Sequence, residues 1–249
     1  MEIQRSRNVP GIRYVVPNAF TATSLLLGLG SIVAAQLGEL ELAGWMIVWC
    51  GLLDVCDGLA ARLLNATSSF GAEFDSMADL VSFGVAPAML VLYAGLEIGG
   101  VEIGGGAFWF LVLAAGLFAL CAAMRLARFN LGTQLPRGRW FHGLPTTAAG
   151  GGLTATAMIL LTRYDGLAEA LNLAIVLPLM LAGLGIAMIS TLRFPKLMRR
   201  DSRAFNVFMI GSASLSYVCG IFRIFPEYLF GLAVFLTVSG LIAGLMAKD

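Results

Sequence analysis

Four aspartates between positions 54 and 79 are the residues of this sequence best suited to chemistry. Asp54 and Asp57 are spaced i, i+3, and Asp75 and Asp79 are spaced i, i+4, so each pair lies on one face of a helix if its segment is helical. Two such pairs facing each other would form a cage of carboxylate oxygens. Hard divalent cations prefer all-oxygen sites of this kind. We therefore expect two divalent ions here, Mg²⁺ or Mn²⁺, with Ca²⁺ as an alternative, placed to bridge a phosphoryl group.

The surroundings of these aspartates strengthen the expectation of metal. The segments that carry them are apolar, and an unpaired carboxylate inside a membrane helix costs roughly 2.5–3.5 kcal/mol on insertion scales. Salt bridges to Arg62 and its neighbours are the alternative means of compensation. Because four acids would then share one nearby base, that alternative leaves most of the charge uncompensated.

Small residues adjoin the aspartates on the same segments. Gly58, Ala61 and Gly71 carry almost no side chain, which lets a bulky ligand approach the backbone. Arg62, one turn beyond Gly58, could bind a phosphate. The pattern indicates a site for a large phosphorylated ligand beside the metal.

The composition places the site in a membrane. The chain has 249 residues, of which 59% are hydrophobic and 12% charged, and its mean hydropathy is +0.87. Such a chain is a polytopic all-α membrane protein. A net charge of +1 argues against a nucleic-acid partner, which requires a clustered basic face. The four cysteines form no CxxC pair, so neither a disulfide framework nor a zinc site is expected.

Apolar runs predict about eight transmembrane helices in a single domain spanning residues 1–249. They lie at Val15–Gln36, Leu42–Leu64, Leu80–Leu96, Ala107–Leu126, Leu144–Thr162, Ala168–Ser190, Phe205–Ile224 and Tyr228–Met246. The stretch Asn130–His142 is expected to be a loop, and Gly150, Gly151 and Gly152 are expected to permit close helix packing.

Basic residues set the orientation of these helices. Of the 16 Lys and Arg residues, only Arg163 and Arg223 fall on one side, while acidic residues such as Glu41 and Glu227 gather there. Because Lys and Arg accumulate in cytoplasmic loops, both termini are predicted to be cytoplasmic, with residues 1–14 as a cytoplasmic segment before a retained first helix. The aspartates then lie at the cytoplasmic ends of the second and third helices.

The motif D-x2-D-G-x2-A-R-x8-G-x3-D-x3-D, filled at every specified position from Asp54 to Asp79, resembles the signature of the CDP-alcohol phosphotransferase family. The resemblance implies an integral membrane enzyme that transfers a phosphatidyl group from a CDP-linked lipid to an alcohol and releases CMP. It also implies a homodimer. The runs from Asp75 to Ala88, from Arg125 to Asn130 and from Phe141 to Pro145 are most similar to the branch whose acceptor is L-serine. Thr146-Thr147, where a further proline is expected, and Ser24, where asparagine is frequent, depart from that pattern.

The resemblance also assigns roles to residues of this sequence. Asp54, Asp57 and Asp75 resemble metal ligands, and Asp79 resembles a ligand that also accepts the proton of the attacking hydroxyl. The residues expected to contact CDP-diacylglycerol are Asn18 (next to Pro17), Gly58, Ala61, Arg62, Ser68 and Gly71.

A serine acceptor brings a carboxylate and an ammonium group, so we expect its pocket at the end of the fourth helix and in the loop that follows. Arg125 or Arg128 could pair with the carboxylate, and Asn130 or His142 could donate hydrogen bonds. Gly143 and Pro145 are expected to shape the wall of this pocket. The alternatives are a basic loop that only sets topology for the arginines and an ordinary surface position for His142.

The predicted function is therefore transfer of a phosphatidyl group from CDP-diacylglycerol to L-serine at the cytoplasmic face of the cell (inner) membrane. One alternative is a sibling enzyme with glycerol 3-phosphate, inositol phosphate or choline as the acceptor. A cation transporter that uses the same acids is another alternative. It predicts metal flux without CMP release and leaves the small residues Gly58, Ala61 and Gly71 unexplained.

Overall fold

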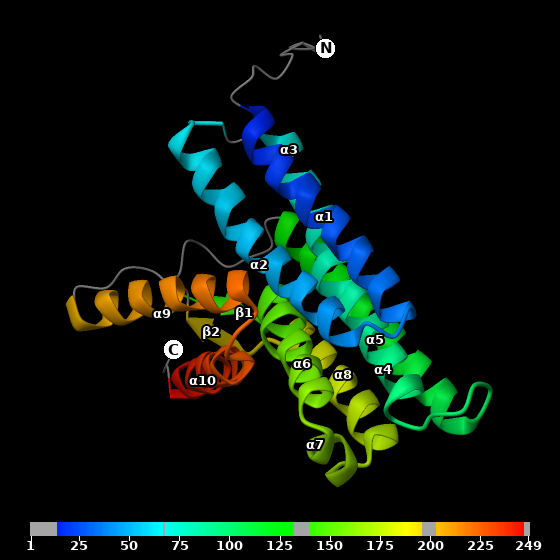
Figure 1. Cartoon of the computed structure of the whole chain (residues 1–249). Coiled ribbons are helices and arrows are strands. Elements are labelled where there is room, and N and C mark those ends of the chain that lie inside the picture. Colours follow the sequence, from blue (N-terminus) through cyan, green and yellow to red (C-terminus); the bar gives the residue numbers. More distant parts are fainter. Residues whose placement is uncertain (1–13, 67, 132–139, 196–202, 247–249) are drawn as a thin grey trace.

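The computed structural model describes residues 14–66, 68–131, 140–195 and 203–246. Apart from one pair of three-residue strands, its regular structure is helical (Figure 1). The helices are α1 (Val15–Gln36), α2 (Leu40–Leu63), α3 (Ser69–Asp79), α4 (Ala86–Glu97), α5 (Gly106–Asn130), α6 (Thr156–Arg163), α7 (Asp165–Ala170), α8 (Leu173–Ile189), α9 (Arg203–Phe222) and α10 (Pro226–Met246). The predicted cytoplasmic segment 1–14 lies outside the described residues except for its last position.

Two π-helical turns interrupt the α-helical geometry. The first, η2 (Leu80–Val85), joins α3 to α4, and the second, η3 (Ala148–Ala155), leads into α6. The ideal Cβ of an added side chain at Gly150 would lie 2.2 Å from the carbonyl oxygen of Phe83, so the two turns pack backbone against backbone. This contact confirms the close packing expected for the glycines at 150–152.

The third predicted segment is wrong at its start. We expected Leu80–Leu96, whereas α3, η2 and α4 form one continuous helix over Ser69–Glu97. It begins where the Ser68 hydroxyl accepts a hydrogen bond from the Gly71 amide at 3.0 Å, an N-cap that supplies one of the missing helical partners. The polar face of α3 concealed this extension, because hydropathy detects only the apolar part of a helix.

Two other predictions of local structure need correction. The sixth predicted segment, Ala168–Ser190, is divided into α7 and α8, because Leu171 has an extended backbone (φ −108°, ψ 136°). The predicted loop Asn130–His142 contains β1 (Trp140–His142), which pairs antiparallel with β2 (Arg193–Pro195). Strands of three residues give too short a pattern to detect in the sequence.

Five helical stretches of the described chain are long and apolar enough to cross a membrane: Val15–Gln36, Leu40–Leu63, Ser69–Glu97, Gly106–Asn130 and Pro226–Met246. Two shorter apolar helices cover Leu173–Ile189 and Asn206–Phe222. The fold is therefore that of an integral membrane protein, and the total of eight spans remains a prediction.

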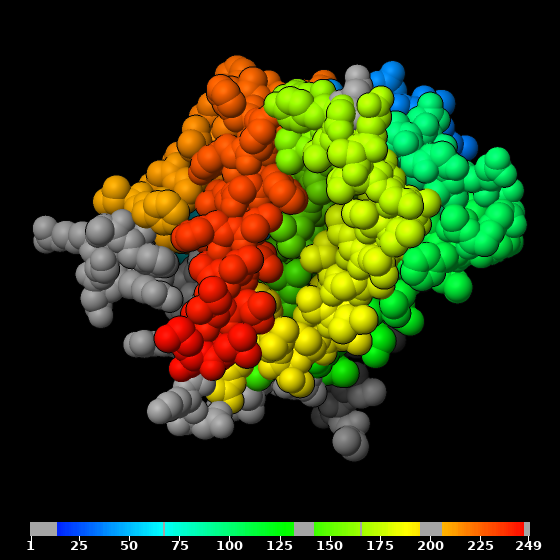
Figure 2. Space-filling view, turned by 90° about the horizontal axis from the view of Figure 1, so that it is seen from below, coloured from blue at the N-terminus to red at the C-terminus, as the bar shows by residue number. Residues whose placement is uncertain are grey.

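The buried core lies between α2, α4, α5, α6 and α8. Its largest fully buried side chains include Trp45, Leu90, Phe118, Met158 and Leu181. Outside this core, α9 and α10 lie to one side of the other helices (Figure 1). Figure 2 shows α10 lying beside η3 and α6, with α8 on the far side of them.

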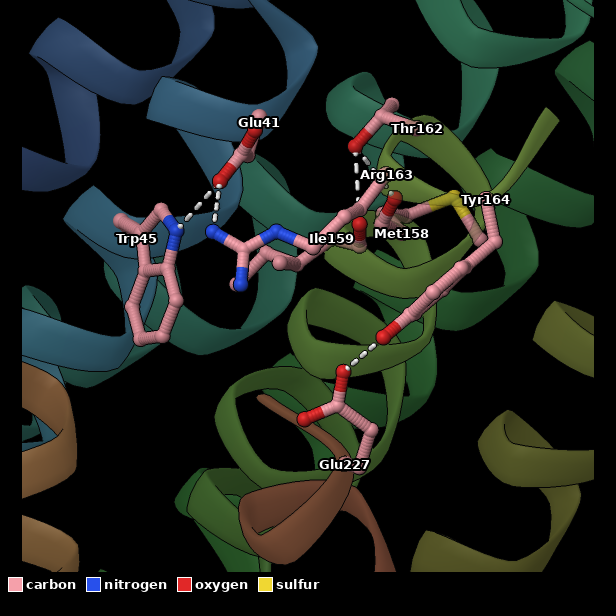
Figure 3. A network of polar contacts seen from close by, with 8 residues as sticks. All are labelled: Glu41, Trp45, Met158, Ile159, Thr162, Arg163, Tyr164 and Glu227. Atoms are coloured by element: carbon pink, nitrogen blue, oxygen red, sulfur yellow. Dashed lines mark hydrogen bonds and ion pairs between the residues drawn. The ribbon is translucent and has the colours of Figure 1, made fainter. Parts of the chain in front are cut away.

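One end of the molecule carries a polar network that joins three helices (Figure 3). Arg163 forms an ion pair with Glu41 at 2.7 Å, and Glu41 also accepts a hydrogen bond from the Trp45 indole. Tyr164 donates a hydrogen bond to Glu227 at the start of α10. The sequence placed Arg163, Glu41 and Glu227 on one side of the membrane, and the structure brings them to one end.

Candidate active site

Three of the four aspartates converge between α2 and α3. The carboxylate oxygens of Asp54, Asp57 and Asp75, one from each residue, all lie within 4.8 Å of one another. We call these residues the aspartate cluster. In Figure 1 the end of α2 and the start of α3 lie at the same end of the molecule as the N-terminal end of α1. The cluster offers oxygen ligands only, so it fits a hard divalent cation and could hold one.

Asp79 lies one helical turn beyond Asp75 and is not one of the three residues whose oxygens all lie within 4.8 Å of one another. Its charge interacts with those of the whole aspartate cluster and with that of Arg125 on α5. Asp79 therefore lies near both the cluster and Arg125, one of the two arginines that the sequence proposed for the acceptor. Its role as a fourth ligand stays a prediction.

Thr21 on α1 is a contact that the sequence analysis missed. Its hydroxyl donates a hydrogen bond to Asp57 Oδ2 at 2.8 Å and also lies 3.2 Å from the carbonyl oxygen of Pro17. Thr21 is 4% exposed and Asp57 is 7% exposed. A usable signal was present, because Thr21 follows Asn18 by one turn and so shares a face of α1 with it.

Three of the six residues predicted for the CDP-lipid, Asn18, Ser68 and Gly71, meet at the junction of α1 and α3. An added Cβ at Gly71 would lie 3.1 Å from Ser68 Oγ and 3.4 Å from Asn18 Oδ1. On α2, an added Cβ at Gly58 would meet no heavy atom within 4 Å, so space is open above that position. Ala61 is partly exposed and Arg62 is exposed, both in the last turns of α2. Their contacts with a nucleotide stay predictions.

On the acceptor side, the two candidate arginines have different partners. Arg125 donates from Nη1 to Thr146 Oγ1 at 2.8 Å, and its buried Nε has no hydrogen-bond partner. Arg128 instead donates to two backbone carbonyl oxygens, those of Ile189 at 3.2 Å and His142 at 3.4 Å. Arg125 is therefore the arginine with donor capacity left for a ligand, while Arg128 ties α5 to β1 and the end of α8.

The remaining pocket candidates each contact a neighbouring element. Asn130 accepts a hydrogen bond from Ser76 at 3.1 Å and donates one to Glu73 at 3.0 Å, which connects α5 to α3. His142 Nδ1 lies 3.3 Å from the carbonyl oxygen of Thr191. Both side chains therefore have partners within the protein.

Gly143 and Pro145 have roles in the backbone here. Gly143 has φ +77°, and an added Cβ would lie 2.1 Å from the carbonyl oxygen of Met188, so only glycine fits this turn against α8. The Pro145 carbonyl accepts the Ala149 amide at 2.9 Å and begins the helix that carries Thr146. Their part in a substrate pocket stays a prediction.

Comparison with known proteins agrees with this geometry. The family model described as CDP-alcohol phosphatidyltransferase matches residues 14–182, which include every candidate site residue named above. A Helicobacter pylori protein named CDP-diacylglycerol–serine O-phosphatidyltransferase is 38% identical over 186 residues, covering 73% of this chain and 72% of the relative. A Bacillus subtilis protein of the same name is 34% identical over 185 residues, covering 72% of this chain and 89% of the relative. A Methanocaldococcus jannaschii protein, also of that name, is 34% identical over 145 residues, covering 58% of this chain and 59% of the relative.

Proposed function

Because the chain belongs to the CDP-alcohol phosphatidyltransferase family, we propose that it transfers the phosphatidyl group of CDP-diacylglycerol to the hydroxyl of L-serine, giving phosphatidylserine and CMP. The observation that carries the proposal is the convergence of the Asp54, Asp57 and Asp75 carboxylates to within 4.8 Å at the family motif. The names of the Helicobacter and Bacillus relatives support serine as the acceptor.

The chemistry of Arg125 supports an acceptor with a carboxylate. A guanidinium group binds a carboxylate through two parallel N–H donors. With Nη1 directed at Thr146 and Nε buried without a partner, the edge formed by Nε and Nη2 is left for a ligand. Serine supplies a carboxylate for this edge, whereas choline supplies none.

For the cofactor, we propose two Mg²⁺ or Mn²⁺ ions held by Asp54, Asp57 and Asp75, with Asp79 as a further ligand. When bound, such ions neutralise and orient the diphosphate of the CDP-lipid. The nucleotide side of the substrate contacts two groups of residues. These are Asn18, Ser68 and Gly71 at the start of α1 and α3, and Gly58, Ala61 and Arg62 at the end of α2.

The transfer itself is a direct displacement. The serine hydroxyl oxygen forms a bond to the phosphorus that carries diacylglycerol, and the bond between that phosphorus and the CMP oxygen breaks. Its electron pair leaves with CMP, while Asp79 accepts the hydroxyl proton. The position of Asp79 one turn beyond Asp75 on α3, near the charge of Arg125, supports this role. No covalent enzyme intermediate is needed.

We propose that the enzyme works in the inner membrane as a homodimer, with one domain over residues 1–249, eight spans and both termini in the cytoplasm. CDP-diacylglycerol then enters from the cytoplasmic leaflet and serine from the cytosol. The distribution of the 16 basic residues along the chain supports this orientation, and the family resemblance supports the dimer.

The test is an assay of purified protein in detergent with CDP-diacylglycerol, Mn²⁺ and a panel of alcohols, with CMP and lipid products identified by mass spectrometry. We expect phosphatidylserine and an equal amount of CMP. Product only with glycerol 3-phosphate, inositol phosphate or choline would reject serine and retain the reaction class. Metal flux into vesicles without any CMP release would favour the transporter alternative.

A further inference from the structure

A hydroxyl group from outside the family motif contacts the aspartate cluster. Thr21 Oγ1 on α1 donates to Asp57 Oδ2 on α2 at 2.8 Å, and both side chains are buried. The contact joins residues 36 positions apart in the sequence. It rests on the proposed function in one respect, because its importance depends on the cluster holding a cation.

The chemistry of this contact favours one orientation of Asp57. A hydroxyl that donates to a carboxylate oxygen holds that oxygen in place, and hydrogen bonds to a charged group are stronger than those between neutral groups. The Thr21 hydroxyl has a single hydrogen, and the carbonyl of Pro17 at 3.2 Å is the longer and uncharged alternative acceptor. The hydrogen bond to Asp57 is therefore the one that dominates.

We propose that Thr21 is a positioning residue of the cation site, which fixes the Asp57 carboxylate toward Asp54 and Asp75. An aspartate side chain rotates about two bonds, and ligand carboxylates are generally oriented by hydrogen bonds from residues behind them. Without the hydroxyl, Asp57 Oδ2 would be buried against apolar atoms of α1. The carboxylate would then turn away from Asp54 and Asp75 and hold the cation less tightly.

The same hydrogen bond connects the cation site to the predicted nucleotide contact. Asn18 precedes Thr21 by one turn on α1, and its Oδ1 lies 3.4 Å from the position of an added Cβ at Gly71 on α3. Thr21 holds this turn of α1 against α2 at Asp57. The side chains assigned to the cation and to the nucleotide are thus fixed relative to each other by one interhelical hydrogen bond.

The test compares Thr21→Val, Thr21→Ser and Thr23→Val. Valine keeps the shape of threonine and removes the hydroxyl, and serine restores it. Thr23 is the matched control, because it is exposed on the same helix and its hydroxyl bonds only to the Ala19 carbonyl at 2.8 Å. Mn²⁺ binding to purified protein in detergent, without lipid substrate, is measured by electron paramagnetic resonance of the free ion.

We expect Thr21→Val to weaken Mn²⁺ binding by about tenfold or more, with Thr21→Ser and Thr23→Val close to wild type. The Mn²⁺ concentration for half-maximal CMP release should rise in parallel for Thr21→Val. Unfolding temperatures in EDTA serve as the folding control and should be similar in all variants. The rise in unfolding temperature that Mn²⁺ causes should be smaller in Thr21→Val than in the wild type.

Unchanged Mn²⁺ binding in Thr21→Val would overturn the role of Thr21 and leave the proposed function intact. Equal losses in Thr21→Val and Thr23→Val would also overturn it, because they would reflect a general weakening of α1. A wild-type protein that bound no Mn²⁺ would reject the cation site itself, and the role of Thr21 with it.

Discussion

Arg125 and Arg128 lie one turn apart on α5, yet their side chains have different surroundings. Arg128 donates to backbone carbonyls of Ile189 and His142, which is the pattern of a residue that stabilises the fold. Arg125 bonds to the Thr146 hydroxyl and retains a buried Nε without a partner. A buried donor without a partner is costly in a folded protein, so a ligand that satisfies it gains affinity.

Replacing Arg125 by lysine tests this assignment. Lysine keeps the charge but cannot form two parallel hydrogen bonds, so we expect the KM for serine to rise about tenfold or more while the KM for CDP-diacylglycerol changes little. Arg128→Lys is the matched control. It should lower the unfolding temperature and change the KM for serine little. A similar increase in both KM values for Arg125→Lys would contradict the assignment. Steady-state kinetics of CMP release provide the measurement.

Two aspartate substitutions distinguish the proposed role of Asp79 as proton acceptor from the proposed role of Asp54 as metal ligand. Asp79→Asn removes the proton acceptor, so we expect turnover to fall by about 10²–10⁴-fold while CDP-diacylglycerol binding is largely kept. Asp54→Asn should instead weaken Mn²⁺ and nucleotide binding together, because Asp54 belongs to the aspartate cluster. CMP release and equilibrium binding of the CDP-lipid measure the two effects. Normal activity in both variants would refute these roles.

At the scale of single residues, the sequence predicted the convergence of three of the four acids and missed the contacts of the hydroxyl groups. The i, i+3 and i, i+4 spacings predicted which faces Asp54, Asp57 and Asp75 occupy, and the three carboxylates converge because α2 and α3 both pack against α1. The roles of Thr21 and Thr146 depend on which side chain a neighbouring helix presents. A threonine in a membrane helix frequently bonds to its own backbone, so residue type alone did not reveal these roles, although the spacing of Thr21 from Asn18 was a usable signal.

The π-helical turns η2 and η3 are the elements that bring the two halves of the site together. η2 begins directly after Asp79, and η3 begins two residues after Thr146. Their backbones touch at Gly150 and Phe83. The extra residue in a π-helical turn changes the direction of the side chains that follow, so these turns set how α3 and the Thr146 segment face each other.

Gly150→Ala tests that contact. An added Cβ would lie 2.2 Å from the Phe83 carbonyl oxygen, and overpacking of this kind costs about 1–3 kcal/mol, so we expect a lower unfolding temperature in detergent and reduced activity. Gly183→Ala on α8 is the control, because its Cβ would meet no heavy atom within 4 Å, and it should unfold at or slightly above the wild-type temperature. Equal stability of both variants would contradict the packing. Thermal unfolding followed by intrinsic fluorescence measures the difference.

At the scale of elements, apolar runs located the helices and missed their polar ends. α1 begins and ends where the sequence predicted, at Val15 and Gln36, because no charged residue interrupts its apolar run. α3 was missed because its polar face and its Ser68 cap mark a helix that hydropathy does not detect. The break between α7 and α8 depends on the backbone at Leu171, which no composition signal marked.

The whole molecule has two chemically different ends. The aspartate cluster lies where α2 meets α3, whereas Glu39, Glu41, Glu97 and Glu169 line a cavity of about 560 Å³ near the network of Figure 3. The grouping of acidic residues at that end agrees with their predicted place on the side opposite the basic loops. The gathering of acidic residues at one end was therefore accessible from the sequence as a charge pattern, whereas the orientation in the membrane and the number of spans remain predictions.

An even number of spans predicts that both termini lie on the same side of the membrane. A green fluorescent protein fusion at either terminus should fluoresce, and an alkaline phosphatase fusion at either terminus should be inactive, because both termini are expected in the cytoplasm. A fusion within the turn between α4 and α5, around Gly104, should give the opposite pattern. Termini with opposite reporter activities would refute the count of eight.

The division of the site along the chain has one more consequence. The residues predicted to contact the cation and the nucleotide all lie between Asn18 and Asp79, on three consecutive helices, whereas Arg125 and Thr146 come from a later part of the chain. The first part can therefore assemble during synthesis before the second has emerged from the ribosome.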